Sequence, residues 1–144
     1  MKKIAFALAA VLLLTLCLTG CGGKEALTLN VYNWGEYISD GSEGSFDTVR
    51  EFEKWYQETY NQKVTVNYTT FASNEDMYAK LKSGAVKYDI IVPSDYMIEL
   101  MIEEDMLEEI NFANIPNYRY IADEYRGLFY DPEDKYSVVF CHIR

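Results

Sequence analysis

The sequence predicts an α/β fold in which a mostly parallel sheet is flanked by helices. Segments with the two-residue apolar period of strands alternate along the chain with segments that have the three- and four-residue spacing of helices. The third strand-like segment, residues 88–93, is a nearly continuous apolar run, as expected for a strand covered on both faces. This alternation favours parallel strands joined by right-handed crossovers, with helices on both faces of the sheet.

The first strand and the first helix follow from their periodicities. Residues 26–33 alternate, and the apolar positions Leu27, Leu29 and Val31 share one face. The serine- and glycine-rich residues 39–45 form a loop. Residues 46–60 form a helix that ends at Asn61, with an apolar stripe made of Phe46, Val49, Phe52, Tyr56 and Tyr60.

A second strand and a second helix come next. Residues 63–68 alternate again. Ser73 is the expected N-cap, since Asp76 follows three residues later, and Gly84 is the expected stop. The inner stripe of this helix comprises Met77, Tyr78 and Leu81.

After the third strand we expect a last helix and then irregular chain. The helix covers about residues 96–105, and its inward side chains are Met97, Leu100 and Met101. Asparagine and proline interrupt the chain that follows, and residues 129–136 form a turn.

The N-terminal segment, residues 1–20, is expected to be a secretory signal outside the fold. Lys2 and Lys3 precede an uncharged apolar run that is shorter than the ~20 residues a spanning helix needs. The letters LTGC, residues 18–21, resemble the lipobox of bacterial lipoproteins, which implies that Cys21 is lipidated. Residues 21–26, CGGKEA, would then be a lipidated tether, whereas an ordinary signal peptide with a chance cysteine is the alternative.

Composition limits the possible functions of residues 21–144. Without Lys2 and Lys3, 11 basic side chains remain against 23 acidic ones, a formal charge of −12, so nucleic acid is not an expected partner. A cationic ligand is electrostatically plausible, although the same charge also fits simple solubility. Cys141 and His142 lack the spacing of a metal site, and no cofactor is expected.

Polar and aromatic residues follow the carboxyl ends of the first and third predicted strands, in the sequences NWGEY and PSDYM. Ligands of parallel sheets bind beyond these ends, so we expect both loops at one binding edge. Aromatic faces attract organic cations, and carboxylates accept hydrogen bonds from ammonium groups. The candidate ligand-binding residues are Trp34, Gly35, Glu36, Tyr37, Ser94, Asp95 and Tyr96.

The same residues also have structural interpretations. Trp34 and Tyr37 could cap the core, and Ser94 with Asp95 could only cap the following helix. Catalysis is not expected, because the lone histidine is terminal and no glycine-rich phosphate loop occurs. Carboxylates are plentiful, but nothing in the sequence sets two of them opposite each other as a glycosidase requires.

Three motifs resemble the bacterial spermidine/putrescine-binding proteins of ABC transporters. They are YNWGEYI, YTTFASNEDMYAKLKSG and YDIIVPSDYMIELMIEEDMLEEI, and they keep their order within residues 27–138. The resemblance implies the first lobe of a two-lobed periplasmic-binding-protein fold that closes over a polyamine and delivers it to a permease.

The resemblance also implies roles for single residues. It makes Trp34 and Tyr37 first-lobe aromatic contacts and Ser94 and Tyr96 contacts from the second loop. Glu36 stands where many relatives carry an acid able to meet an amine. Gly35 stands where some relatives have a threonine or serine contact, so that side-chain contribution is lost here.

The resemblance ends at KYSV, residues 135–138. Relatives continue into a second lobe, whereas this sequence has a tail of another kind, VFCHIR, at residues 139–144. We therefore expect a truncated N-terminal lobe that binds spermidine weakly if at all, because the second lobe of the family supplies most of the carboxylates.

The expected partners are a polyamine (spermidine or putrescine), ABC permease subunits, and the outer face of the cell membrane through the lipid anchor. Alternatives left open are a receptor for another small organic cation, a non-functional truncation product, and a secreted hydrolase fragment.

Overall fold

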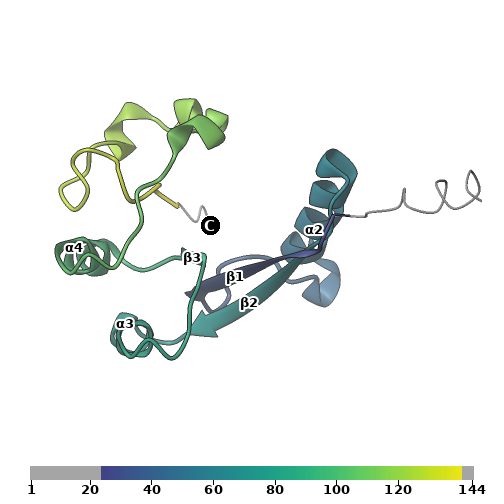
Figure 1. Ribbon diagram of the computed structural model, residues 1–144, viewed down its shortest axis with the longest axis horizontal. Coiled ribbons are helices and arrows are strands. Elements are labelled where there is room, and N and C mark those ends of the chain that lie inside the picture. The colour runs from purple at the N-terminus through teal and green to yellow at the C-terminus, as the bar shows by residue number, and fades with distance from the viewer. Residues whose placement is uncertain (1–23, 141–144) are drawn as a thin grey trace, which may run out of the picture.

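A computed structural model describes residues 24–140, so the expected signal segment and Cys21 lie outside the described residues. The helices and strands are β1 (Leu27–Trp34), α2 (Thr48–Tyr60), β2 (Val64–Phe71), α3 (Asn74–Lys82), β3 (Ile90–Ile91) and α4 (Asp95–Glu103). Figure 1 shows α2 where β1 and β2 begin, and α3 and α4 near the end to which the arrowheads of these strands point.

Within the described residues the strands form one parallel sheet in the order β2-β1-β3. β1 pairs with β2 along its whole length, from Leu27 opposite Val64 to Trp34 opposite Phe71. Pairing with β3 is short, although the Val92 N–H extends it by donating to the Tyr32 carbonyl over 3.0 Å. The predicted α/β class, a parallel sheet flanked by helices, is confirmed.

The core lies between the carboxyl end of the sheet and the helices α3 and α4. Met77 of α3 and Met97 and Met101 of α4 are buried against Tyr32 and Phe71 of the strands. The Tyr32 ring stacks on Tyr88 at 4.4 Å between centroids and meets Phe71 edge-on at 5.0 Å. The inner stripes predicted for these two helices are therefore confirmed.

The third predicted strand is much shorter than expected. Only Ile90 and Ile91 have strand geometry, and Ile90 is 47% exposed, so the expectation of a strand covered on both faces is wrong. β3 has one hydrogen-bonded neighbour among the described strands, which is β1. Leu27, the first residue of β1, is also exposed.

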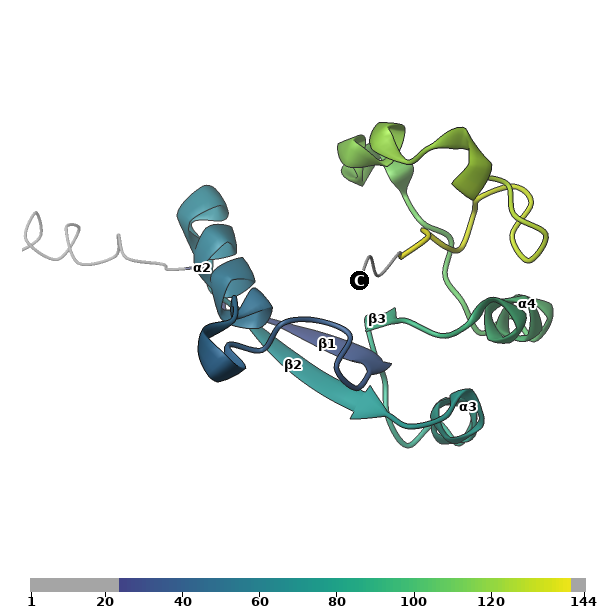
Figure 2. The same cartoon turned by 180° about the vertical axis from the view of Figure 1, so that it is seen from behind.

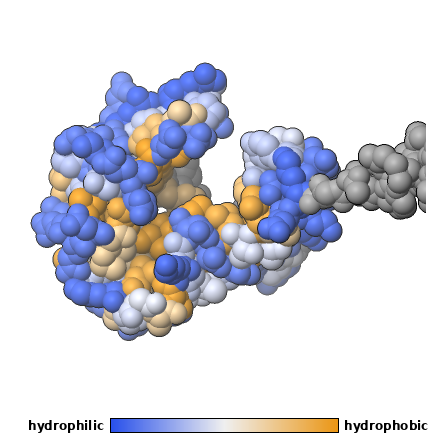
Figure 3. Space-filling view, in the orientation of Figure 1, coloured by the Kyte–Doolittle hydropathy of each residue, from blue (hydrophilic) through white to orange (hydrophobic). Residues whose placement is uncertain are grey.

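Helix α2 forms as predicted but is not buried. It begins at Thr48 because the Asp47 side chain accepts a hydrogen bond from the Arg50 N–H, and it ends at Asn61 in the left-handed conformation. No residue of the helix is buried, and Phe46, Trp55 and Tyr60 are exposed. Figure 3 shows hydrophobic surface in the hollow between α2 and the C-terminal segment, which comprises residues 104–140.

The C-terminal segment is irregular chain with short 3₁₀ turns, namely η2 (Phe112–Asn114), η3 (Pro116–Tyr120) and η4 (Asp123–Tyr125). The predicted turn at 129–136 depends on the buried Asp131 carboxylate. It accepts hydrogen bonds from Lys135, Tyr136 and Ser137. In Figures 1 and 2 the last described residues return to β3. Residues 24–140 include no helix long and apolar enough to cross a membrane.

Candidate functional site

The carboxyl ends of all three strands meet at one edge of the sheet. Trp34, the last residue of β1, lies opposite Phe71, the last residue of β2. The Val92 N–H pairs with β1 just before the chain enters α4. The loops that follow β1 and β3 therefore leave the sheet at the same edge, as the sequence predicts.

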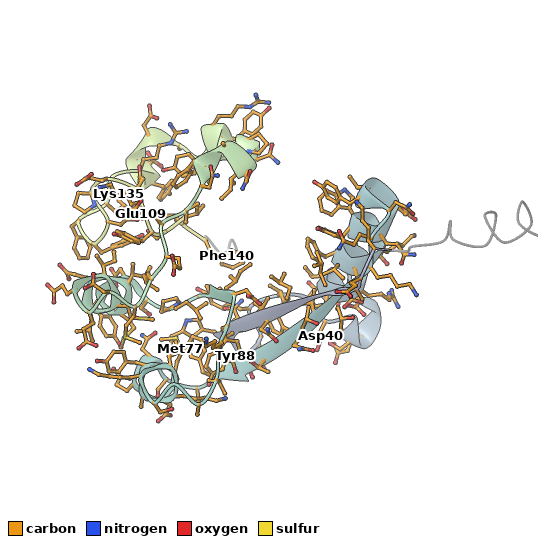
Figure 4. All side chains as sticks on the ribbon, viewed as in Figure 1. Asp40, Met77, Tyr88, Glu109, Lys135 and Phe140 are labelled. Carbon is orange, nitrogen blue, oxygen red and sulfur yellow. The ribbon has the colours of Figure 1, made fainter. Side chains whose placement is uncertain are left out.

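Trp34, at the end of β1, and Tyr37, just after it, are both half-buried. The Trp34 ring lies 4.5 Å from the Phe71 ring, so it caps the core in part. The Trp34 backbone N–H donates to the buried Asn33 side chain over 2.7 Å. The Tyr37 ring lies 5.5 Å from the Phe140 ring, which comes from the end of the described chain. Figure 4 shows the labelled Phe140 over the sheet in this region.

Gly35 and Glu36 form the turn between these rings. Glu36 is exposed and has a left-handed backbone with φ of 59°, an uncommon conformation for a residue with a side chain. A Cβ atom at Gly35 would meet no heavy atom within 4 Å. Glycine is therefore not required at position 35 by steric crowding, because open space surrounds it.

The second loop begins α4. Ser94 is the N-cap residue, but its side chain makes no capping hydrogen bond, so the purely capping interpretation is wrong for Ser94. The Asp95 carboxylate accepts a hydrogen bond from the Tyr96 N–H over 2.8 Å. The Tyr96 side chain is 48% exposed.

Sequence reasoning missed two residues at the start of α3 that contact this loop. The buried Asn74 side chain donates to the Tyr96 hydroxyl over 2.8 Å and accepts from the Ser94 N–H over 3.1 Å. The Tyr96 hydroxyl donates in turn to Glu75 over 3.0 Å. No local pattern marks Asn74, because polar residues are common in the first turn of a helix and its partners lie 20 and 22 residues away.

Tyrosine rings already hold an ammonium group elsewhere in this chain. The Lys80 ammonium lies 4.9 Å from the centre of the Tyr32 ring and donates to the Tyr88 hydroxyl over 3.4 Å. That hydrogen bond is the main cause that raises the pKa of Lys80 above its usual value. Figure 4 labels Tyr88 beside Met77 at this end of the sheet.

One hollow lies away from the candidate edge. An open hollow of about 760 Å³ lies between α2 and the beginning of β2, and its lining includes Arg50, Lys54 and Val64. Across residues 24–140 no three histidine, cysteine or acidic side chains gather in a way that could hold a metal ion.

Similar proteins are found by sequence. No protein-family model matches the chain. The spermidine/putrescine-binding periplasmic protein of Salmonella typhimurium is 34% identical over 143 residues, which is 97% of this chain and 37% of that protein. The putrescine-binding periplasmic protein PotF of Escherichia coli is 31% identical over 84% of this chain and 30% of its own length. The chain thus spans 37% and 30% of the lengths of these two relatives.

Solved structures show the same likeness. The spermidine/putrescine ABC transporter substrate-binding protein of Streptococcus pneumoniae superposes with a TM-score of 0.63 at 36% identity, over 78% of this chain and 31% of that one. The PotD lipoprotein of Treponema pallidum gives a TM-score of 0.62 at 37% identity, over 79% of this chain and 32% of that one. These likenesses agree in sequence and in fold.

Proposed function

Because this chain is a homologue of the bacterial spermidine/putrescine-binding proteins of ABC transporters, we propose that it is the N-terminal lobe of a receptor that captures polyamines outside the cytoplasm for an ABC importer. Its homologues are substrate-binding transport proteins rather than enzymes, and they are periplasmic. The proposed partners are a polyamine and the permease subunits.

One observation in the structure carries the proposal. The loops after β1 and β3 leave the sheet at one edge, and each brings an aromatic ring and a carboxylate. Ring faces cover the methylenes of a polyamine and attract its ammonium groups, with about 0.5–2 kcal/mol for each cation–π contact. Carboxylates accept charge-assisted hydrogen bonds from the same groups.

The proposed roles follow from the chemistry of the side chains. Trp34, Tyr37 and Tyr96 supply the rings, Glu36 and Asp95 supply the charge, and Ser94 supplies a hydroxyl. Gly35 leaves room for the ligand beside the turn.

We propose that the affinity of this chain for a polyamine is low. The chain spans 37% of the length of the Salmonella typhimurium relative, so the 144 residues alone are proposed to hold only part of a polyamine site. Solvent-exposed ion pairs contribute only ~0–1 kcal/mol each. The chain alone therefore binds spermidine weakly, with a dissociation constant of about a millimolar or higher.

Tryptophan fluorescence tests the site directly, because the chain has two tryptophans, Trp34 and Trp55. In Trp55→Phe, Trp34 is the one remaining reporter, and spermidine should change its emission with a millimolar midpoint. In the matched control Trp34→Phe, Trp55 on α2 should not respond.

The outcomes separate the alternatives. Equal responses in both variants would contradict the site, and a low-micromolar midpoint would contradict the partial-site proposal. A response to choline or glycine betaine with none to spermidine or putrescine would instead support a receptor for another organic cation.

The anchor is proposed to be a lipid on Cys21 after removal of residues 1–20, which would hold the protein at the outer face of the cell membrane. One similar solved structure is described as a lipoprotein. Labelled palmitate should enter the chain in cells, and Cys21→Ser should abolish the label. Cys17→Ser, within the signal, is the control that should leave it unchanged.

A further inference from the structure

We propose that Asn74 is a positioning residue that fixes Tyr96 and the start of α4 at the candidate edge. The inference rests on the proposed function only for the role of Tyr96 as a ligand contact. Asn74 itself is 4% exposed, so it acts through Tyr96 and Ser94 and not on a ligand directly.

Both polar atoms of the Asn74 amide are used. The nitrogen donates to the Tyr96 hydroxyl, and the oxygen accepts from the Ser94 N–H. One side chain from the first turn of α3 therefore ties down both candidate residues of the second loop. A buried amide with both groups satisfied defines a single arrangement of its partners.

The Tyr96 ring needs such a restraint because it is half-exposed. Exposed side chains change rotamer on the picosecond to nanosecond scale unless contacts hold them. Here Asn74 donates to the hydroxyl, so the hydroxyl proton is left to donate to Glu75. The ring position and the direction of its O–H are thus fixed before a ligand arrives, which lowers the entropic cost of binding.

Asn74→Asp separates the two hydrogen bonds. An ionised aspartate still accepts from the Ser94 N–H, but it cannot donate to the Tyr96 hydroxyl. If that hydroxyl donates to the new carboxylate instead, it no longer donates to Glu75, so one hydrogen bond is lost in either case. The matched control is Asn67→Asp, the same substitution at an exposed asparagine of β2 whose amide donates to Asn30 over 2.9 Å.

The test uses the full chain labelled with ¹³C at the ζ carbon of tyrosine, whose chemical shift responds to hydrogen bonding of the hydroxyl. The Tyr96 signal among the 13 tyrosines is assigned by its loss in Tyr96→Phe. We expect Asn74→Asp to move this signal and Asn67→Asp to leave it in place. Glu75→Ala, at an exposed position, should move the same signal by a smaller amount.

Spermidine titrations of the same variants report on function. Loss of one hydrogen bond predicts about a fivefold weaker response in Asn74→Asp and no further loss when Tyr96→Phe is already present. An unmoved Tyr96 signal overturns the inference, and so does a moved signal with an unchanged spermidine response. A moved signal in a chain that never responds to spermidine supports the positioning by Asn74 and contradicts only the proposed spermidine binding by this chain alone.

Discussion

The helices at the two ends of the sheet have similar apolar patterns and very different surroundings. α3 and α4 bury Met77, Met97 and Met101 against the strand ends, whereas α2 buries none of its residues. The difference shows that an apolar stripe predicts which face of a helix is apolar, but not whether other residues bury that face. Burial in this molecule is concentrated at the carboxyl edge, where the candidate residues lie.

The contacts of α2 explain how this helix stays in place although none of its residues is buried. The Glu53 carboxylate accepts the Val66 N–H of β2 over 2.7 Å, so a polar contact ties the helix to the sheet. Its aromatic residues contact one another, with Tyr56 and Tyr60 at 4.7 Å and Trp55 and Tyr60 at 5.8 Å between ring centroids. The helix thus presents an aromatic surface to solvent.

The largest expected effect is on the free energy of unfolding, from a substitution in the core beside α3 and α4. Met77→Ala should lower the free energy of unfolding by about 2–5 kcal/mol, because Met77 is fully buried and its removal leaves a cavity. Trp55→Ala on α2 should change it by roughly 0.5 kcal/mol or less. Urea unfolding followed by circular dichroism measures both. Equal losses of stability in the two variants would contradict the difference between α3 and α2.

A smaller effect is expected from the helix caps. Ser73 and Asp47 each accept a hydrogen bond in the first turn of α3 and α2. Either change to alanine removes about 0.5–2 kcal/mol from its helix. We expect Ser73→Ala to lower the unfolding midpoint of the whole chain and Asp47→Ala mainly to increase amide hydrogen exchange within α2. Identical exchange patterns in the two variants would contradict this expectation.

The exposed aromatic surface of α2 gives a third test. Trp55→Lys should reduce the fluorescence of the dye ANS bound to the chain while leaving the free energy of unfolding within about 0.5 kcal/mol of its original value. The same substitution at Trp34, which packs on Phe71, should instead lower the midpoint. An unchanged dye signal in Trp55→Lys would mean that the surface is covered in solution.

The smallest expected effect depends on pH. The Tyr78 hydroxyl, and then the Lys82 ammonium, hold the pKa of Glu104 below its usual value of 4.5. A carboxyl whose pKa is lowered in the folded state stabilises the fold above its unfolded pKa, and this contribution disappears as the pH falls through the folded pKa.

Glu104→Gln should therefore be less stable than the original chain at neutral pH and equally stable in acid, as measured by urea midpoints across pH. Glu99→Gln, an exposed position on the same helix, is the control. A difference that grows on acidification would refute the assignment.

Local sequence patterns could predict the helices and strands. Contacts between distant residues determine the length of β3 and the partners of Asn74. Ser73, Asn61 and Gly84 mark helix ends because capping depends on neighbours within four residues. The shortness of β3 depends on pairing with β1, about 60 residues earlier, which no local pattern encodes. Asn74 was missed for the same reason, since its partners lie 20 and 22 residues away.

The open space beside Gly35 has a consequence for how this turn can change. A hydroxyl-bearing residue introduced there would find no neighbouring atom in its way, so the turn could gain a new polar group with little disturbance of the core. In the proposed site, position 35 is then a point at which a substitution changes polarity and leaves the fold unaltered.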